Sequence, residues 1–214
     1  MCNNISFLGP KGTFTHEAAY ILEGNLIPYC TIPAVMESVS NGVCQFGVVP
    51  IENSIEGPVG LTLDSLAHKF DLKIFKEMVI PINQNLIVNP KTVMNDITDV
   101  YSHSQAIAQC QEFIRDNEIQ PHYAVSTARA AKSILGDKTK AAIGNSKAAE
   151  IYGLEILKPN IQDLDNNETR FVVLSKNDHE PTGRDKTSII FSIYEDKPGM
   201  LYNCLLYTSD AADE

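Results

Sequence analysis

Uncharged hydrogen-bonding side chains follow several apolar segments of this chain, each near the end of a predicted strand. They are Thr13, Asn53, Ser54, Ser102, Gln105, Ser126 and Thr127. In open α/β sheets, ligands bind beyond the carboxyl ends of the strands, where backbone N–H groups at helix N-termini attract anions. Each residue by itself has a simpler explanation, since Ser, Thr and Asn commonly cap helices and form turns. Their recurrence after four strands favours one shared polar crevice.

The segment around Asn53 is the first of two more specific clusters. Glu52, Asn53 and Ser54 stand together ahead of Gly57. An amide offers donors and an acceptor without charge, so Asn53, and likewise Gln105, suits a ligand that carries a hydroxyl and a carboxylate. The alternative is an exposed turn, because Asn and Gly favour left-handed backbone and Glu is usually solvated.

The second cluster joins a hydroxyl to a cation. Thr169 and Arg170 stand directly before the apolar residues 171–174, which predict a buried strand. As functional residues, the arginine would bind a carboxylate through two hydrogen bonds while the hydroxyl donates a third. The alternative is that Arg170 is a surface cation beside a strand end.

The usual catalytic motifs are missing. The sequence has no G-x-S-x-G turn, no H-E-x-x-H helix and no Walker loop, since Gly9 to Thr13 lacks the Walker spacing. The five histidines lack metal-ligand spacing, and Cys110 lies in a helical pattern that predicts a buried thiol. We therefore expect neither phosphoryl transfer nor metal or cysteine chemistry.

Composition narrows the class of protein. The formal net charge is -10, and the 17 Lys and Arg form no concentrated basic surface, so we expect neither nucleic acid nor an anionic membrane as a partner. No apolar run is long enough to span a bilayer, and residues 1–5 do not resemble a signal peptide. Five widely spaced cysteines favour a reducing cytosol over a disulfide framework.

Short strand patterns alternate with helical patterns, which predicts an α/β fold. The expected strands are residues 5–8, 46–49, 99–101, 123–125, 141–143 and 170–174, and a further strand is expected at 187–194. The expected helices begin at Thr15 and cover 33–40, 61–70, 106–116, 128–135 and 147–152, with a polar loop at 50–57. The broken polar stretch 177–186 predicts a domain boundary.

Seven segments, in this order, resemble the prephenate dehydratase family. They are FLGPKGTFTH at 7–16, VPIENSIEG at 49–57, SHSQA at 102–106, STARAA at 126–131, AAIG at 141–144, YGL at 152–154 and NETRF at 167–171. The family usually has proline at the position of Ser104, so this turn is less rigid here. One such motif is weak evidence, but the set in register is strong evidence, and the resemblance extends over essentially residues 5–203.

The resemblance implies a two-lobed fold like that of the type II periplasmic solute-binding proteins, with the substrate in the cleft. Residues 1–180 would form the catalytic domain, whose first lobe extends to about residue 76 and resumes after about residue 160. Residues 186–203 resemble the start of an ACT regulatory domain of α+β type, which is incomplete here. Gly199, Met200 and Leu201 match its phenylalanine-binding loop, although Met200 stands where alanine is usual.

The resemblance also implies an activity, which is conversion of prephenate to phenylpyruvate, water and carbon dioxide without metal or cofactor. Thr169 would donate to the leaving hydroxyl, with Asn53 and Gln105 as the other catalytic residues. The implied substrate-binding residues are Glu52, Ser54, Ser102, His103, Ser126, Thr127, Arg170 and Phe171. In the full-length protein, phenylalanine as effector and a homo-oligomer are expected.

Two alternative functions remain open, and the last residues of the chain are anomalous. The same cleft could serve a solute-binding module without chemistry, or the chain could be a fragment of a bifunctional enzyme with chorismate mutase. Residues 204–214 read as a translation of the transposase-adapter DNA used in sequencing libraries, so we expect this tail to be non-native. A natural acidic tail is the alternative.

Overall fold

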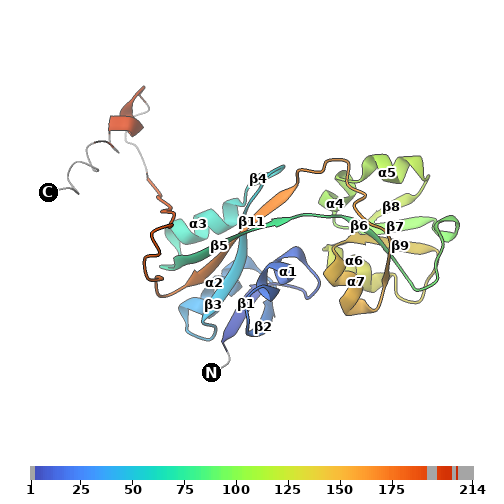
Figure 1. Ribbon diagram of the computed structural model, residues 1–214, viewed down its shortest axis with the longest axis horizontal. Coiled ribbons are helices and arrows are strands. Elements are labelled where there is room, and N and C mark those ends of the chain that lie inside the picture. Colours follow the sequence, from blue (N-terminus) through green and yellow to red (C-terminus); the bar gives the residue numbers. More distant parts are fainter. Residues whose placement is uncertain (1–2, 192–196, 204–205, 207–214) are drawn as a thin grey trace. The chain divides into compact units, whose positions relative to one another are not determined.

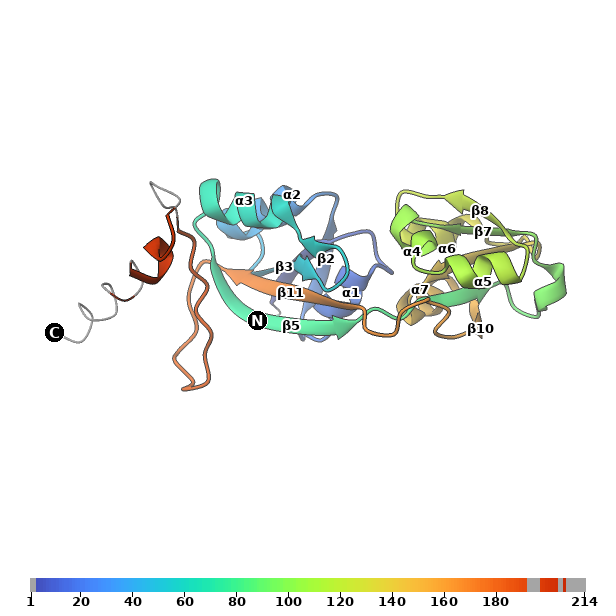
Figure 2. The ribbon, with the colours of Figure 1, turned by 90° about the horizontal axis from the view of Figure 1, so that it is seen from above.

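The computed structural model describes residues 3–191, 197–203 and 206. The chain divides into two compact units, residues 1–179 and 180–214. The first unit contains two sheets, each covered by its own helices, and we call these two parts the lobes (Figures 1 and 2). No helix in the described part of the chain is long and apolar enough to cross a membrane.

The sheet of the first lobe draws its strands from both ends of the first unit. Its strand order is β2-β1-β3-β11-β5. The strands are β1 (Asn4–Leu8), β2 (Asn25–Tyr29), β3 (Phe46–Asn53), β5 (Lys73–Pro81) and β11 (Glu168–Ser175), and the short β4 (Gly57–Pro58) pairs with β3. β1 is parallel to β2 and β3, whereas β11 is antiparallel to β3 and β5. The chain thus returns late to the middle of this sheet.

Helices cover both faces of this sheet, because its central strands carry apolar side chains on both sides. Val173 of β11 packs with α1 (Phe14–Tyr20), and its neighbour Val172 packs with α2 (Ile32–Ser40) and α3 (Gly60–His68). Threonine side chains start two of these helices: Thr13 accepts a hydrogen bond from the His16 N–H, and the cap of α2 is built likewise. The cap places Thr13 at the end of β1.

The second lobe follows the same plan within one continuous segment. Its strand order is β10-β6-β9-β7-β8. The strands are β6 (Asn85–Val88), β7 (Asp99–Ser102), β8 (Gln120–Tyr123), β9 (Lys140–Gly144) and β10 (Glu155–Lys158). The helices are α4 (Ser104–Ala108), α5 (Gln111–Asp116), α6 (Thr127–Ser133) and α7 (Ser146–Tyr152), with a 3-10 turn at Met94–Asp96. α4 and α5 pack on one face of the sheet, and α6 and α7 pack on the other.

Two segments join the lobes, and the second lobe is formed by the middle of the chain. Residues 82–84 link β5 to β6, and residues 159–167 link β10 to β11. The first link lies later than the expected residue 76, because β5 continues to Pro81 alongside β11. Asn53 and Thr169 lie at the ends of β3 and β11 next to these links.

Several predicted elements were wrong in extent. The expected helix 106–116 is two helices, because Cys110 leaves helical geometry (φ -128°, ψ 29°) and the Asp163 carboxylate accepts hydrogen bonds from the first N–H groups of α5. The expected loop 50–57 is largely strand, since β3 extends to Asn53. The strand expected at 123–125 lies earlier, at Gln120–Tyr123. The strands β2, β5, β6 and β10 were not predicted.

The second unit is described in part. Residues 187–191 form no strand, contrary to expectation, and the remainder of that predicted strand lies outside the described residues. Pro198 and Gly199 form the expected turn, after which residues 200–203 are helical. Gly199 has a φ of 84°, a conformation that glycine adopts readily. Apart from Leu206, the tail predicted to be non-native lies outside the described residues.

Candidate active site

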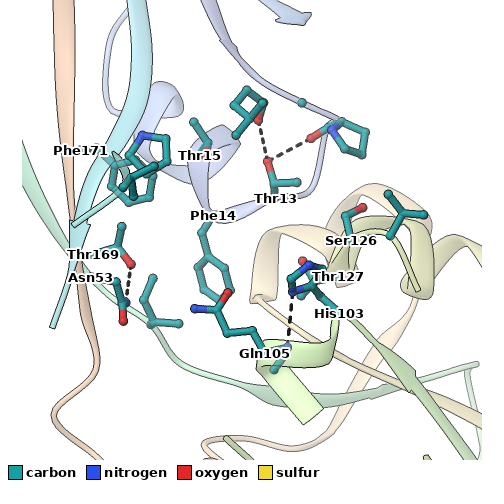
Figure 3. A pocket seen from close by; sticks show the side chains of 18 of the residues that line it. Thr13, Phe14, Thr15, Asn53, His103, Gln105, Ser126, Thr127, Thr169 and Phe171 are labelled. Carbon is teal, nitrogen blue, oxygen red and sulfur yellow. Dashed lines mark hydrogen bonds between the residues drawn. The ribbon is translucent and has the colours of Figure 1, made fainter. Parts of the chain in front are cut away.

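A cavity of about 950 Å³ is lined by residues of both lobes (Figure 3). This volume lies within the range of small-molecule sites. The first lobe contributes the polar residues Lys11, Thr13, Thr15, Tyr29, Asn53, Glu56 and Thr169. The second lobe contributes His103, Gln105, Gln109, Ser126, Thr127 and Arg129, and Gln84 comes from the link between them. The predicted convergence of strand-end turns on one crevice is therefore present.

Asn53 and Thr169 form a hydrogen-bonded pair in this cavity. They are register partners on β3 and β11, and the Asn53 Nδ2 donates to Thr169 Oγ1 at 2.9 Å. The Asn53 Oδ1 accepts from the backbone N–H groups of Ile55 (3.0 Å) and Glu56 (3.1 Å). These bonds fix the amide with its nitrogen toward Thr169, so the threonine oxygen is an acceptor and its proton is available for a ligand.

The side chain of Gln105 projects into the cavity from the second lobe. His103 caps α4, with its Nδ1 accepting from the Gln105 backbone N–H at 3.4 Å. Figure 3 shows Thr169 and Gln105 on two sides of the cavity, with the Phe14 ring between them in this view. An apolar ring between polar groups suits a ligand with an unsaturated ring and polar substituents.

The start of α6 supplies a further wall of the cavity. Ser126 caps this helix, because its Oγ accepts from the Arg129 backbone N–H at 3.2 Å. Thr127 and the exposed Arg129 also line the cavity, as does Lys11. Within the described residues, neither Arg129 nor Lys11 forms a salt bridge. The cavity therefore has cations that can pair with an anionic ligand.

Four of the predicted site residues do not line the cavity. Arg170 and Glu52 are register partners one residue from Thr169 and Asn53, so their side chains project from the opposite face of the strands. There the Arg170 Nη1 lies 3.3 Å from Glu52 Oε2. Ser54 donates to the Asn166 carbonyl and accepts from the Glu168 N–H. Ser102 is fully buried and donates to the Ile143 carbonyl at 2.7 Å.

The other predicted catalytic and substrate-binding residues line the cavity, and the structure adds residues that the sequence did not indicate. Phe171 lines the wall with only 2% of its surface exposed. The missed residues are Phe14, Thr15, Gln84, Gln109 and, as a cavity cation, Arg129. Phe14 and Thr15 lie in the family-like segment 7–16 and Arg129 lies in the segment 126–131, so their position after a predicted strand could have indicated them. Gln84 lies in a link between lobes, where no strand or helix pattern marks it.

A second set of contacts joins the lobes away from the two links. The Asn145 Nδ2 of the second lobe donates to Glu17 Oε2 of α1 at 2.9 Å. The Lys147 Nζ lies 3.9 Å from the centroid of the Tyr20 ring, a cation–π contact. Burial raises the pKa of the Glu17 carboxyl, although the Asn145 hydrogen bond and Lys147 oppose this effect. These contacts join α1 of the first lobe to α7 and its capping residue Asn145 in the second lobe.

Cys110 and His16 are among the other titratable groups whose pKa values are shifted. Burial, followed by the Asp163 charge, raises the pKa of the Cys110 thiol to about 12, so this thiol stays protonated. Burial and the Lys147 and Lys11 charges lower the pKa of His16, whose Nδ1 accepts from the Gly12 N–H at 3.2 Å. Over the residues that the structure describes, no group of three or more His, Cys, Asp or Glu is placed to hold a metal ion.

The fold and the cavity together define a two-lobed α/β protein whose cavity is lined by uncharged donors and acceptors and by the exposed cations Lys11 and Arg129. A model of the family described as prephenate dehydratase matches residues 5–179. The chain therefore belongs to the prephenate dehydratase family.

Relatives and a solved structure agree with this family. A prephenate dehydratase of Methanocaldococcus jannaschii is 43% identical over 92% of this chain and 74% of its own length. A bifunctional chorismate mutase/prephenate dehydratase of Aquifex aeolicus is 43% identical over 94% of this chain and 56% of its own length. The crystal structure of an Arthrobacter aurescens prephenate dehydratase in complex with L-Phe superimposes with a TM-score of 0.84 at 34% identity, covering 94% of this chain and 70% of that one.

The chain spans little more than half the length of several curated relatives that it matches, which are bifunctional chorismate mutase/prephenate dehydratases. Its likeness to the Arthrobacter aurescens structure confirms the two-sheet α/β fold.

Proposed function

We propose that this protein is a prephenate dehydratase, a hydro-lyase that converts prephenate to phenylpyruvate, water and carbon dioxide in phenylalanine biosynthesis. The observation that carries the proposal is the orientation of Thr169. Its oxygen accepts from Asn53 Nδ2, which leaves the hydroxyl proton to a ligand in the cavity. Two relatives that are 43% identical to this chain are named for the same activity.

The proposed reaction requires little covalent chemistry from the protein. Prephenate carries a carboxylate and a hydroxyl on opposite sides of a cyclohexadiene ring. Loss of carbon dioxide supplies the electron pair that forms the aromatic ring, and the hydroxyl leaves as water once it receives a proton. The enzyme must orient the ring and stabilise the charge that develops on the departing oxygen. In this proposal Thr169 donates a hydrogen bond to the departing oxygen and keeps its own proton, because a threonine hydroxyl is too weak an acid to give it up. The proton that completes the water molecule comes from solvent.

The remaining roles follow from position in the cavity. Asn53 orients Thr169, Gln105 binds a polar substituent of the substrate from the opposite lobe, and Ser126 and Thr127 lie where they can bind its carboxylate. Phe14 contacts the ring. We assign the main carboxylate pairing to Arg129, which lines the cavity without a salt bridge among the described residues, because Arg170 projects from the other face of its strand.

Regulation is part of the same proposal. The Arthrobacter aurescens relative is a complex with L-Phe, which supports phenylalanine as an effector of this protein too. The turn at Pro198 and Gly199 and the helical residues Met200 and Leu201 support the start of an ACT domain. We also propose that the lobes correspond to a type II periplasmic-binding-protein-like fold, and that the full-length protein is a cytosolic homo-oligomer.

The direct test is to incubate the purified protein with prephenate and follow phenylpyruvate by its ultraviolet absorbance. A protein-free sample gives the spontaneous rate. We expect turnover well above that rate, without added metal or cofactor. Tight binding of prephenate by calorimetry without phenylpyruvate would instead identify a solute-binding module and overturn the proposed function.

A further inference from the structure

A line of amide side chains connects the link between the lobes to Thr169. The Gln84 Nε2 donates to Gln109 Oε1 at 3.1 Å, and the Asn167 Nδ2 donates to the same oxygen at 3.0 Å. The Asn53 Nδ2 donates to Asn167 Oδ1 at 2.7 Å and to Thr169 Oγ1 at 2.9 Å. Gln84 and Asn167 are each only 2% exposed, so bulk water cannot readily replace these partners.

The orientations of Asn53, Asn167 and Gln109 are coupled through their hydrogen bonds, whereas the Gln84 Oε1 is buried without a partner among the described residues. The Gln109 oxygen receives two N–H groups, which requires Asn167 to present its nitrogen to Gln109 and its oxygen to Asn53. If Asn167 turned over, its nitrogen would face the Asn53 nitrogen, and two donors would meet without an acceptor. The Asn53 oxygen is already occupied by the backbone N–H groups of Ile55 and Glu56. Asn53 therefore stays a donor toward Thr169.

The line also crosses between the lobes. Gln109 follows α4 in the second lobe, and its backbone carbonyl accepts from the Asp163 N–H at 2.7 Å. Asn167 lies in the second link, and Thr169 lies on β11 of the first lobe. The hydrogen-bonded line that ends at Thr169 thus includes a residue of the opposite lobe.

We propose that Gln109 is a positioning residue, whose carbonyl oxygen holds Asn167 in the orientation that presents its Oδ1 to the Asn53 Nδ2, and so keeps Asn53 and Thr169 aligned for the substrate. This inference rests on the proposed function for its effect on turnover. The predicted effect of Gln109 on the Asn53 and Asn167 amides does not depend on the proposed function, and it can be measured separately.

The test compares two substitutions of similar size at this position. Gln109→Glu retains acceptor oxygens for both N–H groups, whereas Gln109→Met retains none. We expect Gln109→Glu to keep nearly the wild-type kcat, and Gln109→Met to lower kcat roughly tenfold at an unchanged KM, since a buried hydrogen bond that orients the donor is lost. The matched control is Gln111→Met, because Gln111 is exposed on the neighbouring helix and should leave kcat unchanged.

Hydrogen exchange of the side-chain amides, followed by ¹⁵N NMR, is the independent measurement. The Asn53 and Asn167 side-chain N–H groups should exchange slowly in the wild type and in Gln109→Glu, and faster in Gln109→Met. Unchanged exchange in Gln109→Met would overturn the proposal, as would equal losses of kcat in the Glu and Met variants. Absence of phenylpyruvate in the wild type would refute the proposed function, while the exchange rates would still decide whether Gln109 fixes the amides.

Discussion

Replacing Thr169 with valine should separate catalysis from folding. The substitution exchanges the hydroxyl for a methyl group and removes one acceptor of the Asn53 Nδ2. That nitrogen keeps the Asn167 Oδ1 at 2.7 Å and the Glu168 carbonyl at 3.1 Å, so no buried donor is left unpaired. We therefore expect a loss of only about 1 kcal/mol in the free energy of unfolding. The melting temperature of a domain of this size should fall by roughly 2–4 °C.

The effect on turnover should be much larger. Removing one donor that stabilises charge in a transition state typically lowers kcat by roughly 100-fold to 1000-fold, or about 2.7–4 kcal/mol. KM should change little, because the hydroxyl proton is used mainly as the leaving oxygen gains charge. A loss of about 1 kcal/mol in stability leaves nearly all molecules folded, so unfolding cannot account for such a fall.

The assay is phenylpyruvate formation across a range of prephenate concentrations, together with a melting curve for each variant. Thr169→Ser is the matched control, since it keeps the hydroxyl and should retain most of the activity. A valine variant with wild-type kcat would refute the donor role of Thr169. Equal losses in the serine and valine variants would indicate that packing of the side chain, and not its proton, is what matters.

Three further predictions test the cations and the pH dependence. Arg129→Ala should raise KM for prephenate at least tenfold, because a charge-assisted hydrogen bond contributes about 1.5–3 kcal/mol. Arg170→Ala should leave KM unchanged, since of these two arginines only Arg129 lines the cavity. Steady-state kinetics of both variants tests this. The raised pKa of Glu17 means that the folded state holds the carboxyl proton more tightly than the unfolded state does, so the contribution of Glu17 to stability falls as pH rises above 4.5. Urea denaturation at a series of pH values should show this decline in the wild type and a flatter curve in Glu17→Gln. The lowered pKa of His16 has the opposite sign, so stability should fall as pH drops below 6.5, and a His16→Gln variant with the same fall would exclude His16 as its cause.

The sequence by itself determined the fold class and the approximate place of the site. The strand patterns at 46–49 and 170–174 lie within β3 and β11, and the polar residues after strands largely meet at one cavity. This succeeds because a buried strand needs a run of apolar residues, and because a parallel strand must be followed by a loop and a helix that begins with a capping residue. Both requirements are local and can be read from neighbouring residues.

The tertiary structure alone decided which side chains face the cavity and which hold the others in place. Thr169 and Arg170 are adjacent in sequence, but a strand sends them to opposite faces, and packing of Phe171 into the core selects the face of Thr169. The partners of Asn53 and Asn167 are separated from them by 114 and 58 residues, respectively. Hydrogen bonds over such separations form only when the two lobes and both links have folded around the cavity, so no local pattern encodes them.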